Sequence, residues 1–333
     1  MSLIDVRDLA RTFVVRKRRG GLTRTRTEVR AVHDLDFAID AGEMVGYIGP
    51  NGAGKSTTIK MLTGILVPSS GHLRVAGLEP SRDRTELARR IGVVFGQRTT
   101  LWWDLPLRDS FELLQKIYRV DASRHRRNLQ EYVELLDLGD LLDTPVRQLS
   151  LGQRMRGDIT AALLHEPEIL YLDEPTIGLD VISKGRLREF LRTLNTERGT
   201  TLMLTTHDLQ DIEALCSRVI VIDRGTAVFD GPLADLHRHG ESHRTLVVDL
   251  VDEAPPIQVP GAHTRKVEGP RQWLSFPADE SAAPIVAAVA SAYDVADLSI
   301  QEPDIEDVIR DLFRPAERGG SPGPGAVSPP GRS

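Results

Sequence analysis

The chain has 333 residues, of which 40% are hydrophobic and 27% are charged, an ordinary composition for a globular protein. This length accommodates one large domain and one small domain, each with its own hydrophobic core. The formal net charge of -6 argues against a general nucleic-acid-binding protein.

The sequence pattern gives no sign of a membrane span or a secretion signal. There is no run of about 18 apolar residues, so no segment is expected to cross a bilayer. The first residues, MSLIDVRDLA, carry charges where a signal peptide needs an apolar core. Cys216 is the single cysteine and lies in an apolar stretch, which predicts a buried thiol in a reducing compartment. We therefore expect a soluble protein of the cytoplasm.

The first third of the chain reads mainly as strands. LIDVRDLA, TFVV, VRAVHDLDFAI, GHLRVAG and IGVVFGQ are rich in β-branched or alternating apolar residues. Residues 16–30 hold seven Lys or Arg against one Glu around a Gly-Gly pair, which indicates a hairpin tip or a mobile loop. We expect a solvated loop there, with contact to anionic lipid as the alternative.

Helices dominate the middle of the chain and then alternate with strands. Apolar residues recur at helical spacing over 107–142, which predicts a helical insertion. From residue 150 to about 236, helices alternate with nearly continuous apolar strands, the pattern of a parallel sheet covered on both faces.

The end of the chain has a different character. Residues 241–315 predict strands and helices in the order β-β-α-β-α, a small α+β domain that follows a large domain over 1–240. Residues 316–333 are rich in Pro, Gly and Ser without apolar anchors, which predicts a disordered tail.

A glycine-rich turn follows the apolar strand MVGYI and fits the pattern G-x-x-x-x-G-K-[ST]. Its glycines let consecutive N–H groups converge on a phosphate, and the helix that follows adds the positive end of its dipole. Lys55 supplies a charge to the β- and γ-phosphates, and the Ser56 hydroxyl completes a Mg²⁺ shell. The predicted phosphate-binding residues are Gly49, Pro50, Asn51, Gly52, Ala53, Gly54, Lys55, Ser56 and Thr57.

Two acids, Asp173 and Glu174, end the apolar strand ILYLDE. In a protein with such a phosphate-binding loop, Asp173 would hold Mg²⁺ through water, and Glu174 could polarise an attacking water as a general base. The plainer alternative is a strand that ends in a solvated acidic turn. The loop upstream favours the first interpretation.

The stretch Leu149-Ser150-Leu151-Gly152-Gln153 resembles the L-S-G-G-Q signature of the ATP-binding-cassette (ABC) ATPases. The resemblance covers residues 1 to about 240, with every expected motif in order. The matching positions are Phe13 for the aromatic that stacks on adenine, Gln97 for the Q-loop, Ser150, Gly152 and Gln153 for the signature, Asp180 for the D-loop and His207 for the switch histidine. One departure is Leu151, which replaces the first glycine of the signature pair and could weaken the signature contact or alter partner packing.

The resemblance implies the ABC cassette form of the P-loop NTPase fold, an α/β architecture. It has a mixed central sheet, an antiparallel β subdomain and a helical subdomain at about 98–165. It further implies an ATPase that binds ATP and Mg²⁺, with Ser56, Gln97 and Asp173 near the metal and Glu174 and His207 catalytic. Ser150 of one protomer would close over ATP held by Lys55 of another, in a homodimer or with a paralogous cassette.

The family's working context implies a partner in the membrane. A separate transmembrane permease subunit would dock near Gln97–Trp103 and the helical subdomain, placing the chain on the inner face of a bacterial cell membrane. Trp102 and Trp103 suit such docking if exposed; the alternative is that both rings pack onto the following helices. The C-terminal sequence EPDIEDVIRDLF is similar to cassette subunits of ABC-2-type exporters, which expel drugs, lipids, polysaccharides or other hydrophobic compounds. The rival class is a soluble ABC-type mechanoenzyme acting on ribosomes or nucleic acid.

Overall fold

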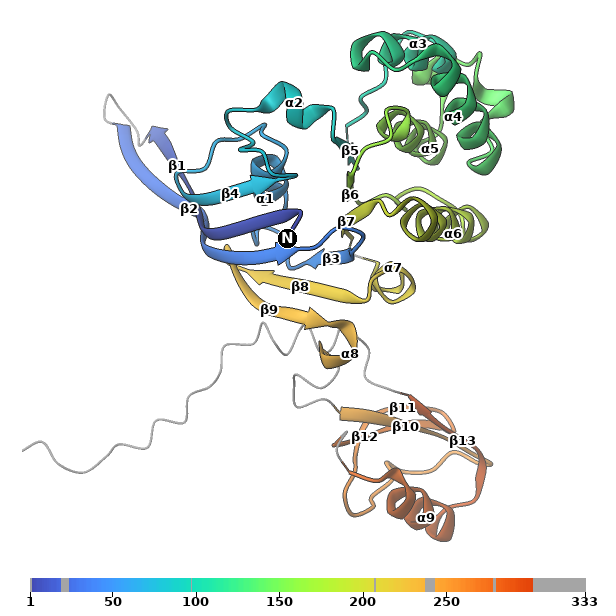
Figure 1. Cartoon of the computed structure of the whole chain (residues 1–333). Coiled ribbons are helices and arrows are strands. Elements are labelled where there is room, and N and C mark those ends of the chain that lie inside the picture. The colour runs from blue at the N-terminus through green and yellow to red at the C-terminus, as the bar shows by residue number, and fades with distance from the viewer. Residues whose placement is uncertain are drawn as a thin grey trace, which may run out of the picture.

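The computed structural model describes residues 2–18, 24–96, 98–206, 208–236, 243–277 and 280–301, and these form three sheets with helices packed around them (Figure 1). The expected mixed central sheet, the antiparallel sheet beside it and the helical layer are all present.

The central sheet has the strand order β5-β6-β7-β3-β8-β9. The bounds are β5 Ile91–Phe95, β6 Ile169–Asp173, β7 Thr201–Thr205, β3 Met44–Ile48, β8 Arg218–Asp223 and β9 Thr226–Pro232. The first five strands run parallel, and β9 pairs antiparallel with β8. The predicted parallel sheet is therefore confirmed for five strands. The β9 edge strand was not predicted from its sequence, TAVFDGP, although the two-residue turn Arg224-Gly225 before it has the positive φ angles of a hairpin.

A second, antiparallel sheet has the order β2-β1-β4. β1 (Ile4–Arg18) and β2 (Arg24–Ile39) form one long hairpin, paired from Ile4↔Ile39 to Arg18↔Arg24, and β4 (Ser70–Val75) pairs with β1 on its other side. Most of the basic segment 16–30 thus belongs to the arms of a hairpin. Its tip, residues 19–23, lies outside the described residues.

Helices complete the two faces of the central sheet (Figure 1). They are α1 Lys55–Leu62, α2 Arg84–Ala88, α3 Leu107–Tyr118, α4 Ala122–Leu135, α5 Leu151–Leu163, α6 Val181–Arg198, α7 Leu209–Leu215 and α8 Leu233–Leu236, with short 3₁₀ turns at Gly139–Leu141 and Val146–Gln148. The predicted helical insertion is confirmed as α3 and α4. The helix expected from about Ser183 begins two residues earlier, at Val181, where Asp180 caps it.

Alternation along each strand divides the core into two clusters. In β6, Leu170 and Leu172 pack with the helices α3 to α6, whereas Ile169 and Tyr171 pack with α1 and the antiparallel sheet. All four side chains are fully buried. Because both faces of a parallel sheet are covered, successive side chains are all apolar, and this explains the continuous apolar runs in the sequence.

The C-terminal part forms a four-stranded antiparallel sheet of order β11-β12-β10-β13, with helix α9 on it and a separate hydrophobic cluster. The bounds are β10 His243–Leu250, β11 His263–Glu268, β12 Arg271–Pro277, α9 Ala282–Ala292 and β13 Val295–Gln301. The predicted order β-β-α-β-α was wrong in one respect: it omitted β11, a largely exposed strand that lacks an apolar pattern. The last predicted helix and the tail lie outside the described residues, and the division near residue 240 stays a prediction.

Adjacent leucines on α3 offer a test of the helical layer. The residue Leu114 is 8% exposed and packs in the core, whereas Leu113 is 39% exposed. We expect Leu114→Ala to lower the free energy of unfolding by about 2–5 kcal/mol, because it removes buried methyl groups and leaves a cavity. The Leu113→Ala control should lose only about 0.5 kcal/mol. Denaturant unfolding of both variants measures the difference, and equal losses would contradict the packing described here.

Candidate nucleotide-binding site

The glycine-rich loop joins the buried strand β3 to α1 and lies tightly against neighbouring backbone. A Cβ atom on Gly49 would lie 2.2 Å from the Ile222 carbonyl oxygen, and one on Gly54 would lie 2.7 Å from that of Ala31. Gly54 also has a φ of +110°, which disfavours any side chain. The loop can take this path only with glycine at these two positions.

Lys55, the first residue of α1, turns back over the loop. Its ammonium group donates hydrogen bonds to the carbonyl oxygens of Gly49 and Pro50, the latter at 3.1 Å. Burial lowers the pKa of Lys55 from its ordinary value, while the carboxylates of Glu174 and then Asp173 act in the opposite direction. The cation therefore lies between the glycine-rich loop and the two predicted acids.

The two acids lie where β6 ends. The Asp173 carboxylate accepts a hydrogen bond of 2.5 Å from the Thr205 hydroxyl at the end of β7. Glu174 adopts a left-handed backbone conformation, with φ of +54°, and its N–H donates to the Thr205 carbonyl oxygen at 2.8 Å. Such a conformation is costly for a residue other than glycine, and it recurs where a site needs a side chain aimed in a set direction.

One cavity of about 510 Å³ brings these groups together. Its lining includes the loop from Pro50 to Gly52, residues Gly54 to Thr57, and both Asp173 and Glu174. The volume is within the usual range for a small-molecule site. Lys60 and Arg98 also line it, although they were not predicted to do so. Their only signal in the sequence is a basic charge next to predicted site residues.

Phe13, predicted to stack on adenine, is not among the residues that line this cavity. Phe13 lies on β1, opposite Val29 of β2. The Arg11 guanidinium lies over the Phe13 ring, 4.8 Å from its centroid. Ala31, two residues along β2 from Val29, does line the cavity. The ring is therefore on a strand next to the cavity, and its role stays a prediction.

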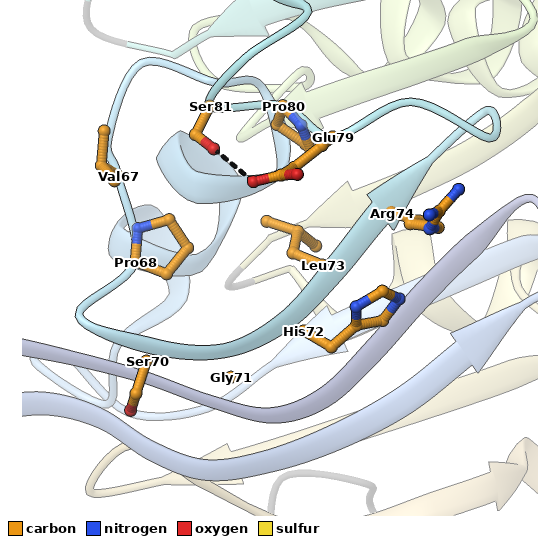
Figure 2. A pocket seen from close by; sticks show the side chains of 10 residues that line it. All are labelled: Val67, Pro68, Ser70, Gly71, His72, Leu73, Arg74, Glu79, Pro80 and Ser81. Carbon is orange, nitrogen blue, oxygen red and sulfur yellow. Dashed lines mark hydrogen bonds between the residues drawn. The ribbon is translucent and has the colours of Figure 1, made fainter.

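A second, smaller pocket of about 230 Å³ lies beside β4, lined by residues between Val67 and Ser81 (Figure 2). The Ser81 hydroxyl donates to the Glu79 carboxylate at 3.1 Å. This pocket contains no residue of the glycine-rich loop and neither acid of β6. It is therefore separate from the predicted phosphate-binding site.

The signature residues lie at the start of α5, outside the lining of the 510 Å³ cavity. Ser150 caps the helix: its hydroxyl accepts from the Gln153 N–H at 3.2 Å, and the Gln153 side-chain oxygen accepts from the Ser150 N–H at 2.9 Å. This reciprocal pair is a capping box, which satisfies backbone donors at the helix start. Ser150 therefore fixes the start of α5.

The signature and the predicted D-loop touch within this chain. A Cβ atom on Gly152 would lie 2.7 Å from the Gly178 carbonyl oxygen, and one on Gly178 would lie 2.8 Å from the Leu151 side chain. Leu151 therefore packs against Gly178, with 37% of it still exposed. Asp180 caps α6 by accepting from the Ser183 N–H and hydroxyl, and these bonds lower the pKa of Asp180.

Gln97 and His207 lie outside the described residues, so their predicted roles stay predictions. The segment just after position 97 is tied to the signature helix. The buried carboxylate of Asp158 on α5 accepts from the Thr99 hydroxyl and the Thr100 N–H, both at 2.9 Å. Burial raises the pKa of Asp158, while these hydrogen bonds act to lower it.

The two tryptophans follow in the same segment and are exposed rather than packed away. Trp102 is 37% exposed and Trp103 is 50% exposed. The Arg154 guanidinium on α5 lies 5.5 Å from the centroid of the Trp103 ring, and the Trp103 carbonyl oxygen accepts from the Arg147 N–H at 3.0 Å. The backbone of this segment is thus anchored while the rings face solvent.

Comparisons with known proteins agree with this geometry. The family model described as ABC transporter matches residues 32–177. The chain is 32% identical to the ABC transporter ATP-binding protein NatA of Bacillus subtilis, over 73% of this chain and 94% of that protein. It is 33% identical to the daunorubicin/doxorubicin resistance ATP-binding protein DrrA of Streptomyces peucetius, over 76% of this chain and 81% of that protein.

Solved structures give the same result. An ATP-binding cassette in a dimeric post-hydrolysis state with ADP and Pi superposes with a TM-score of 0.60 and 26% identity, over 69% of this chain and 98% of that chain. The fold and the site define a P-loop nucleotide-binding protein of the cassette type. The chain belongs to the ATP-binding proteins of ABC transporters, and it is an ATPase.

The glycine-rich loop can be tested with two glycines that both have positive φ. Gly54→Ala should weaken ATP binding by at least about tenfold, because its methyl group would displace the loop from Ala31. Gly77→Ala is the control: its φ is +74°, but nothing lies within 4 Å of the added atom. It should cost about 1–2 kcal/mol of stability and leave ATP affinity unchanged. Titration with a fluorescent ATP analogue measures the affinity of both variants. An equal loss of affinity in both would reject this account of the loop.

Proposed function

We propose that this chain drives export of a drug, lipid, polysaccharide or other hydrophobic compound through a separate transmembrane subunit. The observation that carries the use of ATP is the cavity that holds Lys55, Asp173 and Glu174 on a nucleotide-binding fold. None of the described helices is long and apolar enough to cross a membrane. Export is supported by the relatives' names. DrrA is named for daunorubicin/doxorubicin resistance. A Paraburkholderia xenovorans protein named for Nod factor export is 38% identical to this chain, over 61% of this chain and 66% of that protein.

The roles within the cavity follow from the charges that line it. Lys55 and the loop N–H groups bind the β- and γ-phosphates, and Glu174 acts as general base toward the attacking water. Its backbone bond to Thr205 fixes the position from which the carboxylate reaches into the cavity. Gln97 and His207 would complete the γ-phosphate side of the site.

The residues present also fit Mg²⁺. Ser56 and Asp173 line the cavity and offer a hydroxyl and a carboxylate, the hard oxygen ligands that Mg²⁺ prefers alongside phosphate oxygens and water. Thr205 donates to one oxygen of Asp173, and no other side chain of the described residues donates to this carboxylate, whose second oxygen would face the metal. When bound, the ion would neutralise charge on the phosphates.

The signature residues require a second cassette, because in this chain they lie outside the cavity that holds Lys55. We propose a head-to-tail dimer in which Ser150, Gly152 and Gln153 of one protomer close over ATP bound to the other. The dimeric neighbour supports this arrangement. So does the exposure of Val181 (86%) and Ile182 (71%) beside the D-loop, since apolar side chains so open to water favour a partner surface. The partner is a second copy or a paralogous cassette.

The exposed Trp102 and Trp103 are the proposed contact with the membrane subunit, which would hold the chain at the inner face of a bacterial cell membrane. Aromatic side chains are enriched in the buried centres of interfaces. The alternative, a soluble mechanoenzyme acting on ribosomes or nucleic acid, is not favoured, because the relatives described above are named for transport or drug resistance.

The central test is turnover by Glu174→Gln. Loss of the general base should slow ATP hydrolysis by at least about 100-fold while ATP still binds. The variant should then accumulate as an ATP-bound dimer, visible by size exclusion with light scattering. Glu168→Gln is the control, since this 52% exposed acid precedes the opposite end of the same strand. Undiminished hydrolysis by Glu174→Gln would remove Glu174 from its role, and a variant that binds ATP as a monomer would point to a paralogous partner.

The docking proposal is tested by replacing both Trp102 and Trp103 with alanine. The fraction of the chain recovered with the membranes of its own host cells should fall several-fold, because the partner loses its aromatic contacts. Val228→Ala is the control, an apolar residue on β9 that is 43% exposed. ATP binding by each purified variant verifies folding. Unchanged membrane recovery of the double variant would place the docking surface elsewhere.

A further inference from the structure

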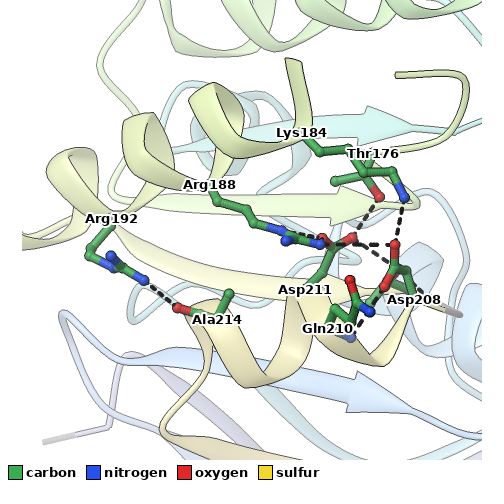
Figure 3. Close-up of polar contacts among 9 residues, drawn as sticks. Thr176, Lys184, Arg188, Arg192, Asp208, Gln210, Asp211 and Ala214 are labelled. Carbon is green, nitrogen blue, oxygen red and sulfur yellow. Dashed lines mark hydrogen bonds and ion pairs between the residues drawn. The ribbon is translucent and has the colours of Figure 1, made fainter. Parts of the chain in front are cut away.

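Asp211, on the short helix α7, has a carboxylate that is fully buried. A buried charge is costly unless other groups pair with it and satisfy its oxygens. The groups that do so here are Arg188, Thr176 and Thr206, from three separate segments, and Figure 3 shows the first two beside Asp211. No role in the site proposed above accounts for it.

Each oxygen of Asp211 has its own partners. Oδ1 accepts from Arg188 on α6, at 2.7 Å from Nε and 2.5 Å from Nη2. Oδ2 accepts from the Thr176 hydroxyl at 2.6 Å and, more weakly, from the Thr206 hydroxyl at 3.5 Å. Two nitrogens of Arg188 thus converge on one carboxylate oxygen, and the two threonine hydroxyls donate to the other.

A second acid, Asp208, extends the same network. It caps α7 and accepts from the Lys184 ammonium at 2.6 Å, and its N–H donates to the Thr206 hydroxyl at 3.0 Å. The Lys184 hydrogen bond lowers the pKa of Asp208 from its ordinary value. Two cations of α6 therefore hold the two acids that flank the start of α7.

The segments that converge on Asp211 adjoin the proposed catalytic residues. Thr176 is two residues after Glu174, in the turn that leads to the D-loop. Thr206 follows Thr205, the residue that contacts both Asp173 and the Glu174 N–H. Arg188 lies on α6, which begins directly after the D-loop residue Asp180. One carboxylate thus joins the turn after Glu174, the end of β7 and the helix after the D-loop.

We propose that Asp211 is a positioning residue for ATP hydrolysis, which holds the turn after Glu174 against β7 and α6 so that the Glu174 carboxylate keeps its place in the cavity. The proposal rests on the role proposed above for Glu174. Asp211 does not line the cavity, so it acts through Thr176 and not on the nucleotide. Small displacements of a catalytic group are enough to slow a reaction strongly.

The mildest test changes only the hydroxyl of Thr176. Thr176→Val keeps the shape of the side chain but removes the donor to Asp211, whereas Thr176→Ser keeps the donor. We expect Thr176→Val to lower kcat about tenfold with the KM for ATP within about twofold of wild type, and Thr176→Ser to retain kcat within about twofold. Wild-type kcat in Thr176→Val, or an equal loss in both variants, would overturn the proposal.

A second experiment separates positioning from stability. Asp211→Asn alone removes the closest carboxylate from the Arg188 guanidinium, which then has only Asp208, at 3.9 Å, and the variant should lower both Tm and kcat. Adding Arg188→Met removes the second charge, so Tm should recover in the double variant, because replacing both members of a buried pair costs little. We expect kcat to stay low in the double variant, measured well below Tm. Recovery of kcat together with Tm would show a merely structural pair and overturn the proposal.

Two reference variants complete the design. Asp230→Asn breaks an ion pair with Arg218 between β8 and β9, at 2.8 Å, and should leave kcat unchanged. Glu174→Gln in the same assay separates the two proposals. If Glu174→Gln is inactive and Thr176→Val is fully active, only the positioning role fails. If Glu174→Gln is fully active, the role of Glu174 fails, and with it the basis of this inference.

Discussion

The site depends on one constraint, which is that parallel strands end at the same edge of a sheet. β3 ends in the glycine-rich loop, β6 ends in Asp173 and Glu174, and β7, between them, ends in Thr205. The hydrogen bonds of Thr205 to Asp173 and Glu174 fix the acids relative to β7, and β7 pairs directly with β3. The glycine-rich loop and the two carboxylates therefore lie close together although they are far apart in the sequence. This is the usual place for a ligand site in such a sheet, at the carboxyl ends of the strands.

Two buried acids, Asp158 and Asp211, join segments near this edge to other elements. Asp158 joins the signature helix to the segment that bears Trp102 and Trp103, and Asp211 joins the D-loop helix to the turn after Glu174. Both accept several hydrogen bonds in low-dielectric surroundings, where such contacts are strong and directional. Asp158 thus ties the segment proposed to meet the membrane subunit to the signature helix, and Asp211 ties the helix beside the proposed cassette interface to the turn after Glu174.

Leu151 shows how a departure from the family's signature is accommodated. The side chain turns toward Gly178 of the same chain and remains partly exposed, while Ser150 and Gln153 still form their capping box. The helix start therefore keeps its backbone geometry, because the cap depends on residues 150 and 153 and not on the residue between Ser150 and Gly152. What changes is the apolar surface beside the D-loop, to which Val181 and Ile182 also contribute.

The sequence by itself determined the local chemistry of this protein: the glycines, lysine and serine of the loop, the strand-end acids and the apolar runs of the buried parallel strands. Each of these features depends on residues that are close together in the sequence, so it can be recognised before the fold is known. The edge strands β9 and β11 were not predicted, because a strand that is largely exposed does not need a continuous apolar run. Only the tertiary structure decided that Arg11 covers the Phe13 ring, that Leu151 packs on Gly178, and that Asp211 gathers Thr176 and Arg188. These partners lie on different elements, and only the path of the chain between the strands brings them within hydrogen-bonding or van der Waals reach.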